Sequence, residues 1–338
     1  MSEIAELPFE SLVELRTRKD IAGEPETLTV SHSSLSGASC RRRFMYYKIL
    51  QMSRRTNSLA GGAGQALHNG YQKYLITGDM GAAIEELLFT YPYRYCKSSF
   101  DPRSVEACLA TLRAIIEKHD RSFSTKQLAQ IEKPNGEIVP AVEVPFEIRL
   151  FSAGERITIY DRPVSYTGYI DEIFRDIEVE GKFSVEDLKT TGKHRKDYTP
   201  MWLFEEQTLP YQFVLSNILG AQLKEFETNI ICAFIDILEP RVQIIPLLRT
   251  ADNVKDWARG LLLELYIIRQ CASHNWWPRN GKQCDTYGIC NYFDICQMSE
   301  ARGLDNFLGT DETGAWPFND TGRGDWEPYF ILDLDLQE

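Results

Sequence analysis

The sequence predicts an α/β fold in which a block of strands lies between helical segments, and three observations favour this class. Between residues 142 and 191, apolar and polar side chains alternate with the period of two that is typical of half-buried strands. On either side of this block, apolar residues recur with the spacing of three to four that is typical of amphipathic helices. Further strands and a long helix follow. This order favours an α/β core with helical additions.

The expected elements can be placed by residue number. The expected helices are a segment carrying Cys40 within 31–50, then 61–78, 80–88, 101–119, 202–219 and 254–270. The helix over 101–119 should open with Asp101 as N-cap and Pro102 at the first helical position, and the last helix should be capped near Asp252. The expected strands are 142–152, 156–164, two hairpin arms at 167–174 and 183–191, 228–238 and 242–250.

The length and composition predict one large domain with additions. A chain of 338 residues with 43% hydrophobic residues can bury a full core. We expect the main domain at 31–300, with a helical insertion at about 61–120. A loose arm or an edge strand should precede it at 1–30. We expect the acidic residues at 301–338 to form a solvated tail, with a partner-binding arm or a DNA mimic over the groove as alternatives.

The net charge and the termini restrict the class of protein. A formal charge of −12 argues against a generally basic nucleic-acid binder, although Arg41–Arg43 and Lys193–Lys196 form local basic islands. No apolar run reaches membrane-spanning length, and the acidic N-terminus lacks the order of a signal peptide. We therefore expect a cytoplasmic protein whose eight cysteines are reduced, so that cysteines grouped in space indicate a metal before a disulfide.

The hairpin within 166–193 carries the main candidate site. Asp187 and Lys189 are two residues apart and therefore project from the same face of one arm, and Asp171 lies on the neighbouring arm. Two converging carboxylates repel each other unless something compensates them, and a divalent cation such as Mg²⁺ or Mn²⁺ is suited to do so. The alternative is a surface hairpin with ordinary solvated charges.

Three polar residues outside the hairpin are further candidates. His68 lies in the segment GQALH on an expected helix, and its imidazole would complete a metal site and favour Mn²⁺ if that helix packs beside the hairpin. Gln207 and Tyr211 are four residues apart on the next expected helix, so they share a face. A lone helical histidine is more often a core or surface residue than a ligand. Ordinary packing would explain the Gln207–Tyr211 pair equally well.

Three late cysteines form a group with regular spacing. Cys284, Cys290 and Cys296 follow a C-x5-C-x5-C pattern, and Cys40 lies near the other end of the chain. Four thiolates suit an iron–sulfur cluster or a structural zinc, although zinc sites usually show paired C-x2-C motifs. Buried cysteines without a ligand are the alternative.

The motifs together resemble a known family. The set comprises the CRRRFMYY segment from Cys40, GQALH ending at His68, GYID ending at Asp171, DLK at 187–189, QTLPY at 207–211 and the late cysteines. In this order they resemble the RecB-like branch of the PD-(D/E)xK nucleases, particularly the iron–sulfur members in phages, AddB-type helicase–nucleases and CRISPR-associated nucleases. The resemblance extends from about Ser31 to Cys296.

The resemblance implies a fold and a set of roles. The fold would be a restriction-endonuclease-like core, with a mixed central sheet flanked by helices. The implied metal ligands are His68, Asp171, Asp187 and the backbone carbonyl of Leu188. Lys189 would be the catalytic lysine, supported by Gln207 and Tyr211. Cys40, Cys284, Cys290 and Cys296 would hold a 4Fe-4S cluster that joins the two ends of the domain, with zinc as the alternative.

Two departures from the family pattern concern the cluster. Relatives often show C-x2-C-x5-C, and the proline that usually follows the first cysteine is replaced by Arg41. A third departure concerns motor activity, because no G-x4-GK[ST] motif is present. Unwinding of DNA would therefore need a helicase or recombination partner.

We expect a metal-dependent DNA nuclease, acting as an exonuclease in DNA recombination, repair or phage DNA processing. The substrate would be DNA, single-stranded or with free ends. Its expected contacts are Arg41, Arg42, Arg43, Tyr46, Lys193 and Arg195. Two alternatives come from other classes: a non-cleaving DNA-binding or scaffold protein that keeps the nuclease fold, and a zinc-stabilised interaction module.

Overall fold

The fold is taken from a computed structural model. It describes residues 27–36, 39–49, 52–54, 59–96, 98, 101–133, 135–285, 290, 292–293, 296, 318–320 and 330–336. The helices are α2 (His32–Ser36), α3 (Arg41–Phe44), the π-helix η2 (Met45–Ile49), α4 (Leu59–Thr77), α5 (Met80–Thr90), η3 (Tyr93–Tyr95), α6 (Val105–Ser122), α7 (Thr199–Trp202), α8 (Leu209–Leu219), η4 (Gly220–Gln222), α9 (Ala251–Ser273) and η5 (Gly281–Gln283). The strands are β1 (Leu28–Val30), β2 (Met52–Arg54), β3 (Lys126–Leu128), β4 (Gln130–Glu132), β5 (Ile138–Pro140), β6 (Val142–Ser152), β7 (Glu155–Arg156), β8 (Thr158–Ile159), β9 (Arg162–Asp176), β10 (Lys182–Thr191), β11 (Glu225–Phe234), β12 (Arg241–Leu247), β13 (Phe318–Asp320) and β14 (Phe330–Asp335).

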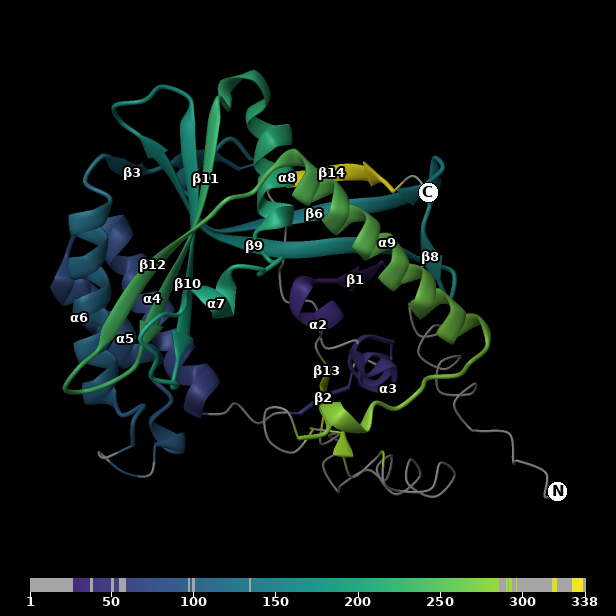
Figure 1. The fold of residues 1–338 in the computed structure, drawn as a ribbon, viewed down its shortest axis with the longest axis horizontal. Coiled ribbons are helices and arrows are strands. Elements are labelled where there is room, and N and C mark those ends of the chain that lie inside the picture. The colour runs from purple at the N-terminus through teal and green to yellow at the C-terminus, as the bar shows by residue number, and fades with distance from the viewer. Residues whose placement is uncertain are drawn as a thin grey trace.

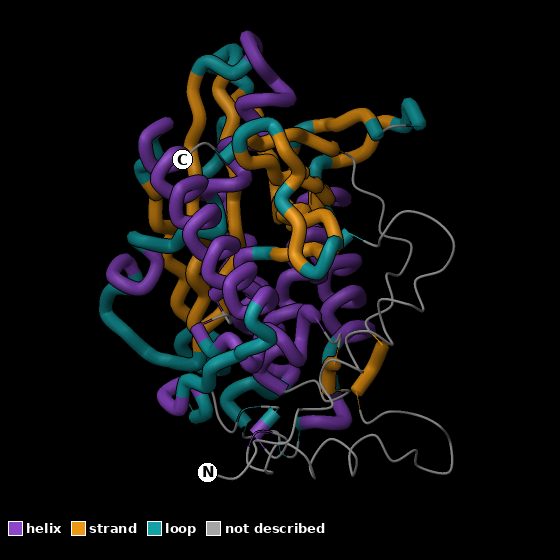
Figure 2. Tube along the Cα trace, turned by 90° about the vertical axis from the view of Figure 1, so that its right-hand side faces the viewer, coloured by secondary structure: helices purple, strands orange, loops and turns teal. Residues whose placement is uncertain are grey.

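A large mixed sheet forms the centre of the molecule (Figure 1). Among the described residues its main path is β12-β11-β10-β9-β6-β14, with β1, β3 and β8 paired to β9 and β7 paired to β6. The pairs β10–β11, β6–β14 and β1–β9 are parallel, and the other pairs are antiparallel. The predicted α/β class is therefore confirmed. The short β2–β13 pair lies apart from this sheet, as two views show (Figures 1 and 2).

The predicted hairpin is confirmed as β9 and β10. The two strands run antiparallel, with Val185 opposite Ile173 and Glu186 opposite Glu172. The turn ends at Gly181, whose φ of 81° lies in the left-handed region that glycine adopts without strain. The long β9 also pairs with β6, so the hairpin is the middle of the sheet rather than a surface addition.

Helices cover the sheet on both sides. α4, α5 and α6 lie together at one end of the molecule, where Leu67 and Leu112 pack against Ile231 of β11 (Figure 1). Ile230, the next residue, points to the opposite face and packs in a small cluster with Trp202 of α7. Because both faces of β11 are buried, its sequence is a nearly continuous apolar run.

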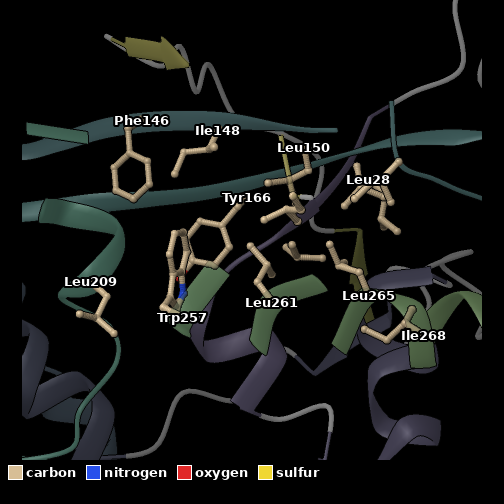
Figure 3. Close-up of a cluster of buried hydrophobic side chains, with 14 of the residues drawn as sticks. Leu28, Phe146, Ile148, Leu150, Tyr166, Leu209, Trp257, Leu261, Leu265 and Ile268 are labelled. Atoms are coloured by element: carbon tan, nitrogen blue, oxygen red, sulfur yellow. The ribbon is translucent and has the colours of Figure 1, made fainter. Parts of the chain in front are cut away.

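The largest core lies beneath α8 and α9. Trp257 and Leu261 of α9 pack against the β6–β9 pair, where Tyr166 meets the Trp257 ring edge to face at 5.4 Å (Figure 3). Leu28 of β1 belongs to the same core and is 2% exposed. The segment before the first expected helix is thus held in the main sheet by burial of β1.

One predicted strand is wrong in its extent. The expected strand 156–164 is broken at Tyr160 and Asp161, which have φ values of 51° and 58°. β8 turns at this point into β9, with Ile159 opposite Arg162. Two consecutive residues with positive φ are the signature of a tight hairpin turn, which the apolar pattern conceals.

Several helix boundaries also differ from the prediction. α6 begins after Ser104, whose side chain accepts a hydrogen bond from the amide of Ala107, while Asp101 caps only the preceding turn. α9 begins after Thr250 instead of Asp252. The expected helix 202–219 is two helices, because α7 ends at Trp202 and α8 begins at Leu209 beside Pro210.

The predicted solvated tail is wrong for 330–335. These residues form β14, which pairs with β6 along the edge of the sheet. Their apolar side chains Phe330, Leu332 and Leu334 pack on the main core, and Arg149 holds Asp333 through two hydrogen bonds. The acidic residues of this segment occupy exposed positions that alternate with the apolar ones, so a strand with one packed face was mistaken for a solvated tail.

None of the helices in the described part of the chain is long and apolar enough to cross a membrane.

Candidate active site

Three carboxylates lie in one row across adjacent strands. The β9–β10 register places Asp187 opposite Asp171, and the β6–β9 register places Glu143 opposite Asp171 from the other side. Regular pairing is interrupted at both positions, because the ladders stop or skip there. Side chains that lie opposite each other in neighbouring strands project from the same face. The row Asp187, Asp171, Glu143 is therefore a direct product of the sheet register.

Helix α4 brings His68 to this row. Its Nε2 atom lies 3.5 Å from Asp171 Oδ2 and 3.1 Å from Glu172 Oε1, and its Nδ1 atom lies 3.3 Å from Glu143 Oε1. Gln72, one turn later, donates to both Glu143 and Glu172. The predicted approach of the His68 helix to the hairpin is borne out by these contacts.

Gly64 allows this close approach. A Cβ atom at Gly64 would lie 2.9 Å from Thr190 Oγ1 of β10, which is shorter than an ordinary contact. The absence of a side chain lets α4 pack directly against the strand that carries Asp187 and Lys189. Gly64 precedes His68 by four residues, so the contact lies on the same side of the helix as the imidazole.

Lys189 is held between a carboxylate and an amide. Its Nζ atom lies 2.7 Å from Asp187 Oδ1 and donates to Gln207 Oε1 at 2.9 Å. Gln207 in turn donates from Nε2 to the Tyr211 hydroxyl at 2.9 Å. Gln207 lies just before α8 and not within a helix, yet it contacts Tyr211 as the shared-face prediction required. These two hydrogen bonds fix the Gln207 side-chain amide so that its oxygen faces Lys189.

Glu205 and His32 hold Gln207 in place. Glu205 Oε1 accepts a hydrogen bond from the backbone amide of Gln207 at 3.1 Å and lies 3.0 Å from His32 Nε2 of α2. Arg249 donates to the backbone carbonyl of Glu205. The hydrogen bond from His32 lowers the pKa of Glu205 to about 2, and Lys189 adds to this shift. Glu205 therefore stays charged and links two distant segments at the rim of the site.

Burial and neighbouring charges shift the pKa values of the ionisable groups at the row. Burial and the neighbouring Asp187 raise the pKa of Asp171 well above its ordinary value. Burial opposes ionisation of Asp187 too, but the Lys189 ammonium outweighs it, so that its pKa is lowered. Burial also lowers the pKa of His68, yet the Glu172 carboxylate reverses that effect and leaves the pKa raised. Two adjacent carboxylates hold one proton between them unless a cation takes its place.

The donor set fits a divalent cation. Asp187 is fully buried, and neither of its carboxylate oxygens accepts a hydrogen bond from the described residues, although Lys189 forms an ion pair with it. Donor atoms of His68, Glu143 and Asp171 all lie within 4.8 Å of one another. Carboxylate oxygens with one imidazole nitrogen are ligands suited to Mg²⁺ or Mn²⁺. Leu188 lines the same cavity, and the role of its carbonyl as a ligand stays a prediction.

The row opens into a cavity of about 630 Å³. Ser31 and His32 of the N-terminal segment border it on one side, and Gly64 and Gln65 of α4 border it elsewhere. Tyr169 of β9 also lines it and is 44% exposed. The space is of the size that usually receives a small-molecule ligand or one residue of a polymer.

Four acidic or basic residues of this site were not predicted. They are Glu143, Glu172, Glu205 and His32. Glu143 and Glu172 were visible in the sequence only as acids within apolar strands, and Glu205 only as an acid two residues before Gln207. Their partners lie more than 70 residues away in the chain, so no local pattern connects them.

The predicted DNA contacts fall into two groups. Lys193 and Arg195 are exposed on the loop after β10, and Arg43 is exposed on α3. Arg41 instead forms an ion pair with Glu264 of α9 at 2.6 Å. The Tyr46 side chain is 1% exposed and its ring packs against Tyr292, so the prediction that it contacts a base is wrong. Its helical spacing reflects burial in the core.

Arg42 also serves the fold. Its amide donates to the Pro278 carbonyl at 3.2 Å, and its Nε atom donates to the Trp277 carbonyl at 3.0 Å. In the opposite direction, the side-chain amide of Asn280 donates to the backbone carbonyl of Ser39 at 3.0 Å. These bonds tie the segment around Cys40 to the segment that leads into the late cysteines.

The structure brings the four predicted cysteines into one region. Burial and the nearby thiols of Cys290 and Cys40 raise the pKa of Cys284, and burial with Cys40 raises the pKa of Cys296. In the part of the chain that is described, no three of these sulfur atoms lie within 4.8 Å of one another.

A mixed sheet that brings two aspartates, a histidine and a lysine together beside one cavity is an arrangement suited to nucleases that work with a divalent metal. This chain belongs to the PD-(D/E)XK nuclease superfamily, whose family model matches residues 29–297. The match includes most of β1, the carboxylate row, Lys189, Gln207 and the late cysteines. The broad part of the resemblance noted in the sequence is therefore confirmed.

Two solved structures are similar to this chain. A crystal structure from Eubacterium rectale, described as a candidate exonuclease, shares 13% identity with a TM-score of 0.47 and covers 87% of this chain and 92% of that chain. The crystal structure of SSO0001 shares 12% identity with a TM-score of 0.32 and covers 83% and 93%. No curated protein sequence matches the chain. The family assignment therefore rests on the family model.

Proposed function

We propose that this protein is a metal-dependent deoxyribonuclease of the RecB-like branch that hydrolyses phosphodiester bonds from strand ends. The observation that carries the proposal is the convergence of Asp171, Asp187 and Lys189: Asp171 and Lys189 line one cavity, Asp187 is buried beside Lys189, and Gln207 fixes the lysine. A nuclease needs a cation site beside a positively charged donor, and these residues meet both needs.

The residues have distinct roles in the proposed reaction. Asp171, Asp187, His68 and the Leu188 carbonyl would hold Mg²⁺ or Mn²⁺, which supplies a water of lowered pKa and positive charge near the phosphate. The Lys189 ammonium has three N–H donors, and two of them face Asp187 and Gln207. The third is free to orient the attacking water or to stabilise charge on a phosphate oxygen.

The cavity favours a single strand with a free end. A space of about 630 Å³ holds a nucleotide, whereas a duplex is far wider. The exposed Tyr169 ring offers a surface on which a base can stack, and Lys193, Arg195 and Arg43 offer charge for the phosphates beyond it. The proposed substrate is therefore single-stranded DNA, or a DNA end that has been opened.

We propose further that Cys40, Cys284, Cys290 and Cys296 hold a 4Fe-4S cluster. The support is their common location and the free thiol of each of the four. The cluster would join the segment before the cavity to the end of the domain. Because the chain lacks a motor motif, the proposed setting is DNA recombination, repair or phage DNA processing beside a helicase.

Cleavage assays on matched variants test the proposal. End-labelled linear and circular DNA, single- and double-stranded, is incubated with Mg²⁺ or Mn²⁺ and with wild type, Lys189→Ala or Lys224→Ala. Lys224 is an exposed lysine paired with Glu180 far from the cavity, so its variant is a matched control. We expect linear strands to be shortened by wild type and Lys224→Ala, with the rate reduced roughly 100- to 1,000-fold in Lys189→Ala.

The substrates separate the possible outcomes. Circles that stay intact while linear strands are shortened support an exonuclease, and cut circles would change the assignment to an endonuclease. If wild type with its cluster binds all of these substrates and cuts none of them, the protein is a DNA-binding or scaffold protein and the enzymatic proposal is overturned.

A further inference from the structure

Arg103 is a basic residue of the helical insertion that the proposed function does not use. It lies just before Ser104, the N-cap of α6, and its side chain is partly buried. In the part of the chain that the structure describes, no carboxylate forms an ion pair with its guanidinium. An arginine that is held in place without a carboxylate partner is suited to bind an anion from solution.

Gly192, which directly follows β10, provides the place where this guanidinium lies. A Cβ atom at Gly192 would lie 2.6 Å from Arg103 Nη2 and 3.2 Å from Arg103 Cζ, so the missing side chain lets the guanidinium lie against the backbone. The main chain of Arg103 is fixed as well. Its amide donates to Asp101 Oδ1 at 2.9 Å, and its carbonyl accepts a hydrogen bond from the buried Tyr91 hydroxyl at 2.6 Å. The position of the guanidinium is therefore defined before any ligand binds.

The contact between Arg103 and Gly192 lies close to the cavity. Lys189 and Thr190 line the cavity, and Gly192 follows two residues after Thr190. Because three residues of extended chain span at most about 11 Å, Gly192 lies within that distance of Lys189. Stacked nucleotides of one strand are about 3.4 Å apart, so this interval corresponds to about three nucleotides at most. A short stretch of one DNA strand can therefore contact Lys189 and Arg103 together.

The surroundings of Arg103 are basic, although the chain has a formal charge of −12. Gly192 leads into three exposed basic residues that form no ion pair with the described residues, namely Lys193, Arg195 and Lys196. An exposed aromatic ring lies on the other side. The Tyr93 ring packs edge-on against Tyr91 at 4.9 Å and is 54% exposed. Unpaired cations next to an exposed aromatic ring suit the phosphates and bases of a single strand.

We propose that Arg103, seated on Gly192, anchors a phosphate of single-stranded DNA a few nucleotides away from the phosphate that reacts. The inference rests on the proposed function, because it assumes that the reacting phosphate lies at Lys189. A guanidinium can hold two oxygens of one phosphate through parallel N–H donors, which a lysine cannot do. The helical insertion thus contributes a strand-binding residue as well as His68.

Binding of a single strand tests the inference without any cleavage. A fluorescent strand of about 16 nucleotides is titrated with the full chain in the absence of divalent cations, and anisotropy gives the dissociation constant at several NaCl concentrations. Arg103→Gln removes the charge, and Gly192→Ala keeps the arginine but places a methyl group where its guanidinium lies. Arg113→Gln is the matched control, because it makes the same charge change at an exposed position of α6.

We expect Arg103→Gln to weaken binding at least fivefold at low salt. The slope of log Kd against log[NaCl] should fall by about 0.7, the value for one phosphate contact on a single strand. Gly192→Ala should weaken binding at least threefold, and Arg113→Gln should bind within twofold of wild type. In cleavage assays on the same strand, Arg103→Gln should raise KM more than it lowers kcat, because the anchoring contact is made equally before and during the reaction.

The opposite results would overturn the inference. They are an Arg103→Gln variant that binds within twofold of wild type with an unchanged slope, or an Arg113→Gln variant that loses as much affinity as Arg103→Gln. Either would leave the proposed nuclease intact, because cleavage by wild type is measured separately. Wild type that neither binds nor cuts single strands would remove the proposed substrate together with the anchor. Circular dichroism checks that the variants fold, and Gly192→Ala decides the matter if Arg103→Gln does not.

Discussion

At the scale of single residues, the geometry of the candidate site depends on groups that hold Lys189 in place. Lys189 is positioned by Gln207, which is positioned in turn by Glu205 and His32. Each link is a charge-assisted or amide hydrogen bond of ordinary length. A lysine on a flexible stem loses much rotamer freedom when it is fixed in this way, so the supporting residues contribute directly to the geometry of the site.

The Glu205–His32 pair predicts a dependence of stability on pH. The folded pKa of Glu205 is lowered to about 2, so its contribution is present above the unfolded value near 4.3 and is lost as pH falls from there towards 2. Glu205→Gln should therefore lower the free energy of unfolding at pH 7 by roughly 1 to 2 kcal/mol after allowance for solvent screening. Thermal melts of both proteins from pH 7 to pH 3 measure this difference.

The melting curves of the two proteins should converge as the pH falls below about 4. A difference that stayed constant down to pH 3 would show that the charge of Glu205 is not what stabilises the fold. Glu206→Gln, which changes an exposed neighbour, is the matched control and should melt like wild type throughout.

At the scale of elements, the site is formed where one helix docks against a hairpin. α4 contributes His68, β9 contributes Asp171, and β10 contributes Asp187 and Lys189. The closeness of α4 to β10 depends on Gly64, which faces Thr190. A small shift of this helix would move the imidazole relative to the carboxylates, and misplacement by about 1 Å can reduce a rate roughly 100-fold.

We predict that Gly64→Ala disturbs this docking. The new methyl group would meet Thr190 Oγ1, and crowding of this kind costs roughly 1 to 3 kcal/mol. The variant should melt at a lower temperature and cleave DNA at least tenfold more slowly. Removing the opposing oxygen with Thr190→Ala in the same chain should restore much of both properties, which melting curves and cleavage rates of the double variant measure.

Gly260→Ala is the control for a glycine without such a contact. Gly260 lies in α9 with open space beside it, so alanine there should stabilise the helix by roughly 0.5 to 1 kcal/mol. If Gly64→Ala behaved like Gly260→Ala, or if Thr190→Ala gave no recovery, the close approach of α4 would not be what Gly64 provides.

At the scale of the whole molecule, the two ends of the domain meet at the cysteines. The segment around Cys40 is bonded to the segment before Cys284 through Arg42 and Asn280. The same N-terminal segment continues backward into α2, whose His32 lies at the rim of the cavity. A group that joined the cysteines would close a loop containing most of the chain, and closing such a loop restricts the unfolded state.

Loss of the proposed cluster should therefore affect stability before chemistry. Cys40→Ser is expected to lose the absorbance near ~400 nm and to unfold with roughly 3 to 5 kcal/mol less free energy, by analogy with other long-range cross-links. Cleavage at low temperature should fall less than threefold, since Cys40 does not touch the carboxylate row. Anaerobic purification, absorbance spectra and melting curves provide the measurements.

Cys96→Ser is the matched control, because Cys96 is partly exposed and lies outside the group of four. It should keep both the absorbance and the melting temperature of wild type. Wild-type protein that purified anaerobically with zinc and without iron would replace the cluster with a zinc site. A Cys40→Ser variant as stable as wild type would contradict the structural role itself.

The sequence by itself determined the features that depend on local periodicity and on side-chain chemistry. Period two placed Asp187 and Lys189 on one face of a strand, and the turn residues specified the antiparallel pairing of β9 with β10. The prediction that His68, Asp171 and Asp187 hold a metal rests on their chemistry and their order, and it stays a prediction. These properties are fixed by neighbours in the chain, so they can be inferred before any fold is known.

Only the tertiary structure decided which distant segments meet at the site. Glu143 became the third member of the row because β6 pairs with β9, and Glu205 became a support for Gln207 because α2 brings His32 to it. Tyr46, which has the composition of a base-stacking residue, is instead buried beneath Tyr292. The order of strands, the docking of helices and the burial of side chains depend on contacts between residues far apart in the chain. Local sequence patterns therefore do not predict them.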